Sequence, residues 1–222
     1  MLKKRINCDL GECLTPSPDG IAMPLIDMAN IACGGHAGDD ESMTNTIQLA
    51  KQHQVTIGAH PSYADKSNFG RVSQPLEKCV LFGLLHTQIA YFKTLCSKND
   101  ATLEYIKPHG ALYHDMMHNA AVFDALCKAI QSVDDNLKLV VQAGIKTPKT
   151  DLCLLFETYA DRGYQGLKML PRTEKGALLT DADAIVAQYH HFLNNSTMQI
   201  DTICFHSDNP ASIKALQKLS NA

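Results

Sequence analysis

Short apolar segments alternate along the chain with longer segments in which apolar residues recur at helical spacing. Seven short segments are almost continuously apolar, which is typical of strands buried on both faces of a parallel sheet. These predicted strands span residues 5–9, 28–32, 55–60, 103–107, 138–142, 153–159 and 201–206. Helical spacing is clearest over residues 41–53, 75–97, 120–133, 181–193 and 210–219, and Pro75 is expected in the first turn of the longest helix.

The repeated alternation of strand and helix predicts right-handed βαβ units, arranged either as a (β/α) barrel or as an open parallel sheet. A chain of 222 residues suits one α/β domain over residues 1–222, because barrels of this size commonly form single units. The sequence contains no internal repeat, no low-complexity tract and no evident linker. The polar segment 61–74 is a long loop, and long loops in compact domains are often functional.

The charge balance argues against binding to nucleic acid or to an anionic membrane surface. The formal net charge is −3, and the Lys and Arg residues are scattered without a basic stripe. We expect neither a signal peptide nor a membrane span, because no apolar stretch follows the basic N-terminal segment and no run approaches about 18 apolar residues. The eight cysteines form no C-x-x-C pair, which predicts free, mostly buried thiols and a cytoplasmic location.

Polar and ionisable residues accumulate at the carboxyl ends of the predicted strands. In a parallel barrel these ends lie on one rim, where the active sites of such barrels are built. The residues expected on this rim are Asp9, Glu12, His36, Asp39, His60, Lys107, His109, Asp161, Arg162 and His206. One such residue would carry little information, but their recurrence at most of the strand ends predicts a composite active site.

The first two candidates, Asp9 and Glu12, suit a general acid and base pair or a pair of cation ligands. The alternative is that Asp9 caps a turn and Glu12 faces water. Residues 30–40, N-I-A-C-G-G-H-A-G-D-D, contain glycines that allow the backbone to approach a ligand closely. The segment lacks the lysine of a Walker A loop, which excludes a standard nucleotide loop and leaves its amides able to bind another anion.

Within this segment His36 is the expected site residue, and Cys33 is expected to be a buried packing residue rather than a nucleophile. Asp39 is expected either in the site or as the N-cap of the following helix. Four other histidines are expected on the surface, namely His114, His118, His190 and His191.

His60 ends the third predicted strand, and Arg71 in the loop after it is a candidate ligand for a substrate carboxylate. Lys107 and His109 lie two positions apart at one strand end, so their side chains face the same side. A buried lysine rarely lacks a role. Asp161, Arg162 and Arg172 follow the sixth predicted strand. The planar guanidinium groups of the two arginines are suited to bind a carboxylate or phosphate, and the alternative is a structural Asp–Arg pair.

Nearly the whole chain is covered by six ordered motifs: I-N-C-D-L-G-E, N-I-A-C-G-G-H-A-G-D, I-G-A-H-P-S-Y-A-D with F-G-R, I-K-P-H-G-A-L-Y-H, Y-A-D-R-G-Y-Q with L-P-R, and D-T-I-C-F-H-S-D-N-P. Together they resemble the LamB/YcsF family, which comprises the A subunit of bacterial ATP-dependent 5-oxoprolinase. The resemblance implies a distorted TIM-like (β/α) barrel with about seven parallel strands, related to glycoside hydrolase and deacetylase barrels. It also implies ring opening of 5-oxo-L-proline to L-glutamate, driven by ATP hydrolysis, in complex with separate B and C subunits.

By resemblance, the family's acidic pair falls on Asp9 and Glu12, and its glycine-rich loop falls on Asn30, His36 and Asp39. The family's later histidines and its basic residues fall on His60, His109, His206, Lys107, Arg162 and Arg172. Cys8 and Ser207 replace the usual alanine and glycine. The segment between Gly11 and Ala29 is short, and residues 145–152 are interrupted by proline where relatives carry a helix.

Three hypotheses describe the function. In the first, ATP phosphorylates the lactam oxygen, Asp9 or Glu12 activates water, histidines move protons, and basic residues bind the carboxylate or phosphate. In the second, the chain is an amidohydrolase or deacetylase that needs no ATP, with Asp9, His36 and His60 as ligands of a divalent metal ion. In the third, it is a non-catalytic subunit that binds a small carboxylic acid. The sequence leaves open where ATP binds, whether a metal is present, and whether the chain forms a homo-oligomer.

Overall fold

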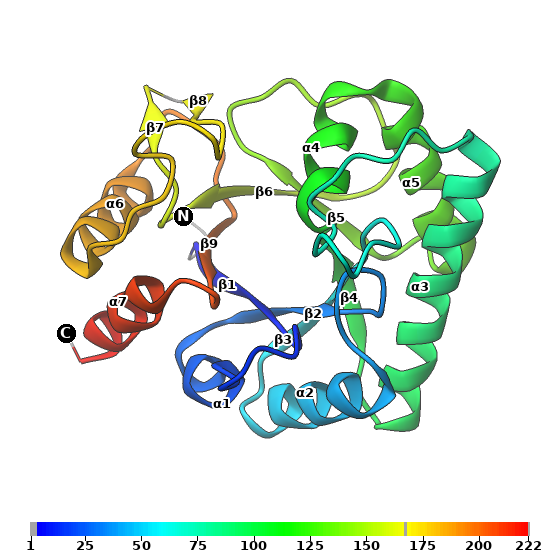
Figure 1. The fold of residues 1–222 in the computed structure, drawn as a ribbon, viewed down its shortest axis with the longest axis horizontal. Helices are drawn as coiled ribbons and strands as arrows, with labels where there is room; N and C mark the ends of the chain where they lie inside the picture. Colours follow the sequence, from blue (N-terminus) through cyan, green and yellow to red (C-terminus); the bar gives the residue numbers. More distant parts are fainter. Residues whose placement is uncertain (1–3, 167, 222) are drawn as a thin grey trace.

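The computed structural model describes residues 4–166 and 168–221, and its centre is a closed barrel of seven parallel strands (Figure 1). The strands are β1 (Arg5–Leu10), β2 (Met28–Ala32), β3 (Thr56–His60), β4 (Leu103–Ile106), β5 (Lys138–Gln142), β6 (Leu154–Tyr159) and β9 (Thr202–His206). Neighbours pair in parallel, and β9 closes the barrel between β6 and β1. The predicted TIM-like barrel is confirmed, and all seven predicted strands belong to it.

Helices cover the outside of the barrel (Figure 1). They are α1 (Asp19–Ala22), a 3-10 helix (Met23–Leu25), α2 (Asp40–Gln52), α3 (Lys78–Lys98), α4 (Gly110–His118), α5 (Ala120–Val133), α6 (Ala182–Asn194) and α7 (Pro210–Ser220). The helical spacing in the sequence predicted α2, α3, α5, α6 and α7 but not the nine-residue α4, which is too short for a clear period. A hairpin of β7 (Tyr164–Gln165) and β8 (Lys168–Met169) stands outside the barrel, and residues 145–152 form no helix.

The longest helix, α3, differs from its prediction at its N-terminus. It begins at Lys78, so the placement of Pro75 in its first turn is wrong. Glu77 has an extended backbone, and Leu76 packs against the core from this extended segment before the helix begins.

α3 is also more apolar than the sequence pattern suggested. Its 21 residues contain an 18-residue window of mean hydropathy 1.3, and by length and composition it is long and apolar enough to cross a membrane. The helix packs along α5 (Figure 1). Five of its apolar side chains belong to the core of the described chain: Leu81, Leu85, Ile89, Phe92 and Leu95. Packing against α5 and the core therefore buries these side chains, and 39% of the 18-residue window is buried.

One glycine in β3 makes room for a polar side chain inside the barrel. A Cβ atom on Gly58 would lie 2.2 Å from Cε2 of Tyr105, which faces it from β4. With no side chain at residue 58, the Tyr105 ring lies over β3 and its hydroxyl donates to Asn30 Oδ1 in β2 at 2.7 Å. The polar interior thus depends on the absence of a methyl group in β3.

We expect Gly58→Ala to destabilise the protein by about 1–3 kcal/mol, because the added methyl group displaces the Tyr105 ring or the β3 backbone. The matched control is Gly83→Ala in α3, where an added Cβ meets nothing within 4 Å. Since alanine is the better helix former, this control should gain about 0.5–1 kcal/mol. Urea unfolding followed by circular dichroism measures both, and equal stability of the two variants would contradict the crowding at Gly58.

Candidate active site at the carboxyl ends of the barrel strands

A cavity of about 570 Å³ opens at the carboxyl ends of the barrel strands. Its wall contains nine of the residues that the sequence placed in the site: Asp9, Glu12, His60, Arg71, Lys107, His109, Arg162, Arg172 and His206. Asn30, His36 and Asp161 are buried and contact wall residues from behind. The structure thus brings most of the predicted residues to one cavity, and Asp39 is the exception.

The ammonium group of Lys107 lies deep in the site between two buried carboxylates. Lys107 Nζ is 2.9 Å from Asp9 Oδ1 and 3.1 Å from Glu157 Oε2. It also donates to Asn7 Oδ1 at 3.1 Å and lies 3.0 Å from Cys204 Sγ. Lys107 is 2% exposed and Glu157 is 0% exposed, so water screens these charges little.

These contacts fix the protonation states at the centre of the barrel. Burial by itself raises the pKa of Asp9, but its interactions with His60 and with the Lys107 ammonium group outweigh burial and hold that pKa well below its usual value. Burial lowers the pKa of Lys107, yet the negative charges of Asp9 and Glu157 raise it well above its usual value. Asp9 is therefore a carboxylate near neutral pH, and Lys107 is an ammonium ion that cannot serve as a base or an amine nucleophile.

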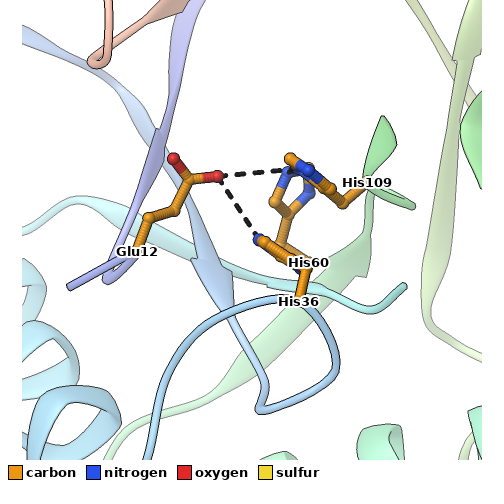
Figure 2. Close-up of side chains that lie close together, drawn as sticks. All are labelled: Glu12, His36, His60 and His109. Carbon is orange, nitrogen blue, oxygen red and sulfur yellow. Dashed lines mark hydrogen bonds and ion pairs between the residues drawn. The ribbon is translucent and has the colours of Figure 1, made fainter. Parts of the chain in front are cut away.

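Three imidazoles and one carboxyl group form a buried cluster beside this centre (Figure 2). Each comes from or just after a different strand, β1 to β4. Their facing nitrogen and oxygen atoms lie within 4.8 Å of one another, and the residues are Glu12, His36, His60 and His109. Burial, followed by the negative charge of Asp9, raises the pKa of Glu12 well above its usual value. The cluster therefore places a carboxyl group where it is stable either with a bound proton or beside a cation.

Backbone carbonyls fix the orientation of two of these imidazoles. His60 Nδ1 donates to Lys107 O at 2.6 Å, and His109 Nε2 donates to Phe69 O at 2.9 Å, because a carbonyl oxygen can only accept. The remaining ring nitrogens, His60 Nε2 and His109 Nδ1, face each other at 2.9 Å. His60 Nε2 also lies 3.4 Å from Asp9 Oδ2, which links the cluster to the barrel centre.

His36 lies behind the wall of the cavity. Its ring stacks on His109 with centroids 3.7 Å apart and planes 4° from parallel. Its Nε2 is 3.3 Å from Glu12 Oε1, and its Nδ1 has no hydrogen-bond partner among the described residues. Burial, followed by the neighbouring His60 imidazole, lowers the pKa of His36 to about 2, so this imidazole is neutral. His36 is placed to position Glu12 and His109 rather than to touch a molecule in the cavity.

The ligand set Asp9, His36 and His60 suggested by the sequence does not come together as one group. Glu12 takes the place of Asp9 next to the two histidines. Asp9 Oδ1 contacts Lys107 Nζ and Asn30 Nδ2 at 2.9 and 2.7 Å, and its Oδ2 lies between His60 Nε2 at 3.4 Å and His206 Nε2 at 4.0 Å. Asp9 groups instead with two residues of β9, Cys204 and His206.

His206 carries a positive charge on the β9 side of Asp9. Its Nδ1 donates to Asp161 Oδ1 at 2.8 Å, and its Nε2 lies 4.0 Å from Asp9 Oδ2. Ser212 Oγ donates to Asp161 Oδ2 at 2.7 Å, which fixes that carboxylate in turn. Burial lowers the pKa of His206, but the charge of Asp161 raises it above its usual value. Asp161 is therefore a positioning residue for His206 and does not face the cavity.

The three predicted arginines have different surroundings. Arg162 Nε donates to Ala177 O at 2.9 Å and its Nη2 donates to Leu170 O at 2.8 Å, so this guanidinium ties together the loop around the β7–β8 hairpin. Arg71 lies at the mouth of the cavity, paired with Asp208 at 2.9 Å. Arg172 is exposed and lines the cavity from the loop after β8. Arg71 and Arg172 are thus the two arginines placed to meet an anion entering the site.

Comparison with known proteins identifies the family of the chain. The model of the LamB/YcsF family matches residues 5–222. The chain belongs to the LamB/YcsF family. It is 39% identical to the A subunit of 5-oxoprolinase from Vibrio vulnificus strain YJ016 over 247 aligned positions, which cover 100% of this chain and 98% of that protein. The A subunit of 5-oxoprolinase from Pseudomonas fluorescens strain Pf0-1 is 35% identical, with coverage of 100% and 97%.

A solved structure of the same fold comes from Thermus thermophilus, where it is described as a lactam utilization protein. It has a TM-score of 0.88 and 26% identity, and the match covers 99% of this chain and 96% of that one. A family 4 carbohydrate esterase from Streptomyces lividans and a GH113 β-1,4-mannanase have TM-scores of 0.50 and 0.56 at 10% identity. These two share the barrel fold, as the resemblance to deacetylase and glycosidase barrels implied.

In this LamB/YcsF chain the glycine-rich segment after β2 serves the packing of the protein. A Cβ on Gly35 would lie 2.5 Å from Ser62 Oγ, so the glycine makes room for a buried side chain rather than for a ligand. Asp39 accepts from the backbone N of Ser42 at 2.8 Å in a capping box at the start of α2. It is exposed and borders a separate hollow. Asp39 therefore fills the capping role that the sequence left open and lies outside the cavity, while Cys33 is buried as expected.

Sequence reasoning overlooked Glu157 and Asn7, which complete the centre of the site. Glu157 lies in β6 and accepts from Asn7 Nδ2 at 3.2 Å and from the Tyr159 hydroxyl at 2.9 Å. A signal was present, since a glutamate inside the strand L-L-F-E-T-Y is rare unless it is paired. Its partner Lys107, however, is 50 positions away in the sequence, and no local spacing links them.

We expect Lys107→Met to destabilise the protein by about 3–5 kcal/mol, because Asp9 and Glu157 lose the cation between them. The double variant Lys107→Met/Glu157→Gln should recover part of this loss. The matched control is Lys51→Met, whose exposed pair with Asp100 contributes about 0–1 kcal/mol. Urea unfolding measures all three variants, and equal losses at Lys107 and Lys51 would contradict the proposed importance of the central ammonium group.

The Asp161–His206 pair predicts a pH dependence of stability. Because His206 has a raised pKa in the folded protein, its stabilising effect is complete below the unfolded value, about 6.5, and is lost as the pH rises through the folded pKa. We expect Asp161→Asn to lower the free energy of unfolding by about 3 kcal/mol near pH 6, where the pair is charged. The difference from the wild type should shrink toward pH 9. A difference that stays constant across this range would contradict a titration of His206 between pH 6 and pH 9.

Proposed function

We propose that this chain is the A subunit of a 5-oxoprolinase that opens the lactam ring of 5-oxo-L-proline to L-glutamate, using ATP and separate B and C subunits. The observation that carries the proposal is the cavity in which the Asp9 carboxylate lies between His60 and the His206 cation. The Vibrio and Pseudomonas relatives are named as A subunits of 5-oxoprolinase, and the Thermus neighbour is described as a lactam utilization protein. These names supply the substrate class, and the cavity supplies ionised groups for its chemistry.

ATP is needed to activate the substrate, because a five-membered lactam is a stable amide and a poor electrophile. Transfer of the γ-phosphoryl group to the lactam oxygen releases ADP and leaves a more reactive carbon. Water then adds to that carbon, the ring C–N bond breaks, and the nitrogen takes up a proton, which gives an acyl phosphate. A second water hydrolyses the acyl phosphate to the carboxylate of glutamate and inorganic phosphate.

Particular side chains of the cavity suit particular steps of this reaction. Asp9 stays ionised and can orient the attacking water by accepting a hydrogen bond from it. His206, held as a cation by Asp161, faces the same space and can stabilise negative charge that develops on oxygen. Arg71 and Arg172 at the mouth suit the substrate carboxylate or the phosphoryl group.

We place ATP and the partner subunits at the mouth of this cavity. The cavity of about 570 Å³ is in the range of sites for drug-sized ligands, larger than a single five-membered lactam requires. The sequence has no Walker A motif, so we place the nucleotide at a site shared with the partner subunits. All eight cysteines are free, which suits the reducing cytoplasm where we place the reaction.

The test is an assay of glutamate and ADP formation from 5-oxoproline and ATP, with and without co-purified B and C subunits. We expect equimolar products from the complete complex and none from the chain alone. Asp9→Asn should lower kcat by about 100-fold or more, while its circular dichroism spectrum stays that of the wild type. The matched control is Asp100→Asn, at an exposed carboxylate outside the cavity, which should leave kcat unchanged.

Three results would reject parts of the proposal. Turnover by the chain alone would refute the need for partners. Glutamate formation without ATP would favour a hydrolase that acts on the amide directly. Full activity of the complex with Asp9→Asn would favour a subunit that binds the substrate without catalysing the reaction.

A further inference from the structure

Two buried imidazoles in the cluster face each other with the same kind of atom. His60 and His109 each use one ring nitrogen to donate to a backbone carbonyl, at 2.6 and 2.9 Å. When both rings are neutral, the facing atoms His60 Nε2 and His109 Nδ1 both carry lone pairs. They lie only 2.9 Å apart, so a stable arrangement needs a positive species between or beside them. That species is either a proton or a metal ion.

The third polar group of the cluster favours a metal ion. Glu12 Oε1 lies 3.6 Å from His109 Nδ1, and the Glu12 side chain is 4% exposed. Bonds of about 2.1 Å to one ion would separate neighbouring ligand atoms by about 3.0 Å at right angles and about 3.4 Å at tetrahedral angles. The observed separations of 2.9 and 3.6 Å lie close to these values. A shared proton would satisfy the two nitrogens and leave Glu12 Oε1 at 3.6 Å from the charged pair, whereas an ion between the three atoms would bind all of them.

The orientation of the rings selects the ligands. The His60 and His109 rings are 86° apart, so their planes intersect and one ion can lie in both. His36 and His109 are parallel at 3.7 Å, so an ion in the plane of one ring lies well off the plane of the other. Glu12, His60 and His109 also line the cavity, whereas His36 does not. The backbone carbonyls that accept from His60 and His109 are the outer-shell partners that metal-bound histidines usually have.

The other group of ionisable atoms near the site suits a metal less well. It consists of Asp9, Cys204 and His206. Lys107 Nζ lies 3.0 Å from Cys204 Sγ and 2.9 Å from Asp9 Oδ1. The Lys107 ammonium group therefore already contacts two of these three residues, and it would repel a metal ion bound there.

We propose that Glu12 Oε1, His60 Nε2 and His109 Nδ1 bind one divalent transition-metal ion of the Zn²⁺ type, with a remaining coordination position open to the cavity. Two imidazoles and one carboxylate form a ligand set used by catalytic zinc sites. Imidazole ligands also favour such ions over Mg²⁺ and Ca²⁺, which prefer oxygen. The proposed metal site does not depend on the identity of the lactam or on ATP. The metal-site proposal can therefore be correct even if the proposed function is wrong.

The experiment is a Zn²⁺ titration of the full-length chain after chelator treatment, with bound metal counted by mass spectrometry and affinity measured by calorimetry. We expect one Zn²⁺ per chain, and Mg²⁺ should not compete. Glu12→Gln and His109→Gln should weaken binding by more than the roughly 10- to 100-fold that loss of an outer-shell partner costs. His36→Gln should stay within that outer-shell range, and the exposed His114→Gln should bind like the wild type.

Folding is checked separately by circular dichroism of each metal-free variant. Glu12→Gln preserves the shape of the side chain, so it keeps the test valid where His109→Gln fails to fold. The proposal is overturned if the folded wild type binds no stoichiometric Zn²⁺, or if His36→Gln loses as much affinity as Glu12→Gln. A further contrary result is a proton shared between His60 and His109, seen by nitrogen NMR in protein that is saturated with Zn²⁺. Assays of glutamate formation are not needed for any of these outcomes.

Discussion

The ammonium group of Lys107 is the charge on which the site depends. It lies inside the barrel between the carboxylates of Asp9 and Glu157, and all three side chains are almost completely buried. Lys107 follows β4, Asp9 belongs to β1 and Glu157 belongs to β6, so the Lys107 ammonium group connects three separate strands. Without it, two carboxylates would face each other in a medium that screens charge poorly. The ammonium group keeps Asp9 ionised and holds it in place for its other neighbours.

Asp9 separates two regions with different charge. On the β2–β4 side, burial keeps His36 and His109 neutral, and Glu12 is a carboxyl group that gains from a nearby cation. On the β9 side, Asp161 keeps His206 positively charged. Neutral imidazoles can bind a metal or accept a proton, and a fixed imidazolium can stabilise developing negative charge. One cavity wall therefore offers both properties within a few side chains.

The surroundings of the site divide the arginines between structure and binding. Arg162 is used to hold the loop around the β7–β8 hairpin through two carbonyl oxygens, although its spacing in the sequence suggested an anion ligand. Arg71 and Arg172 remain at the mouth. The deep part of the cavity is therefore occupied by charges that are already paired, while two further cationic groups, one of them paired with Asp208, lie near solvent at its mouth.

The sequence by itself determined the parallel α/β architecture, because its strands are buried on both faces and appear as continuous apolar segments that need no knowledge of their neighbours. The choice of a closed barrel over an open sheet came from the resemblance to the LamB/YcsF family. The sequence also located Asp9, His60, Lys107, His109 and His206, since polar residues at the carboxyl ends of parallel strands must share a rim. Only the tertiary structure decided how these residues pair. Glu157 belongs with Lys107, Glu12 rather than Asp9 joins His36 and His109, and Asp39 caps a helix outside the cavity. Such pairings depend on distances of a few ångströms between segments that are far apart in the chain. These distances set the burial and the charge of each group, and no local pattern of residues in the sequence contains them.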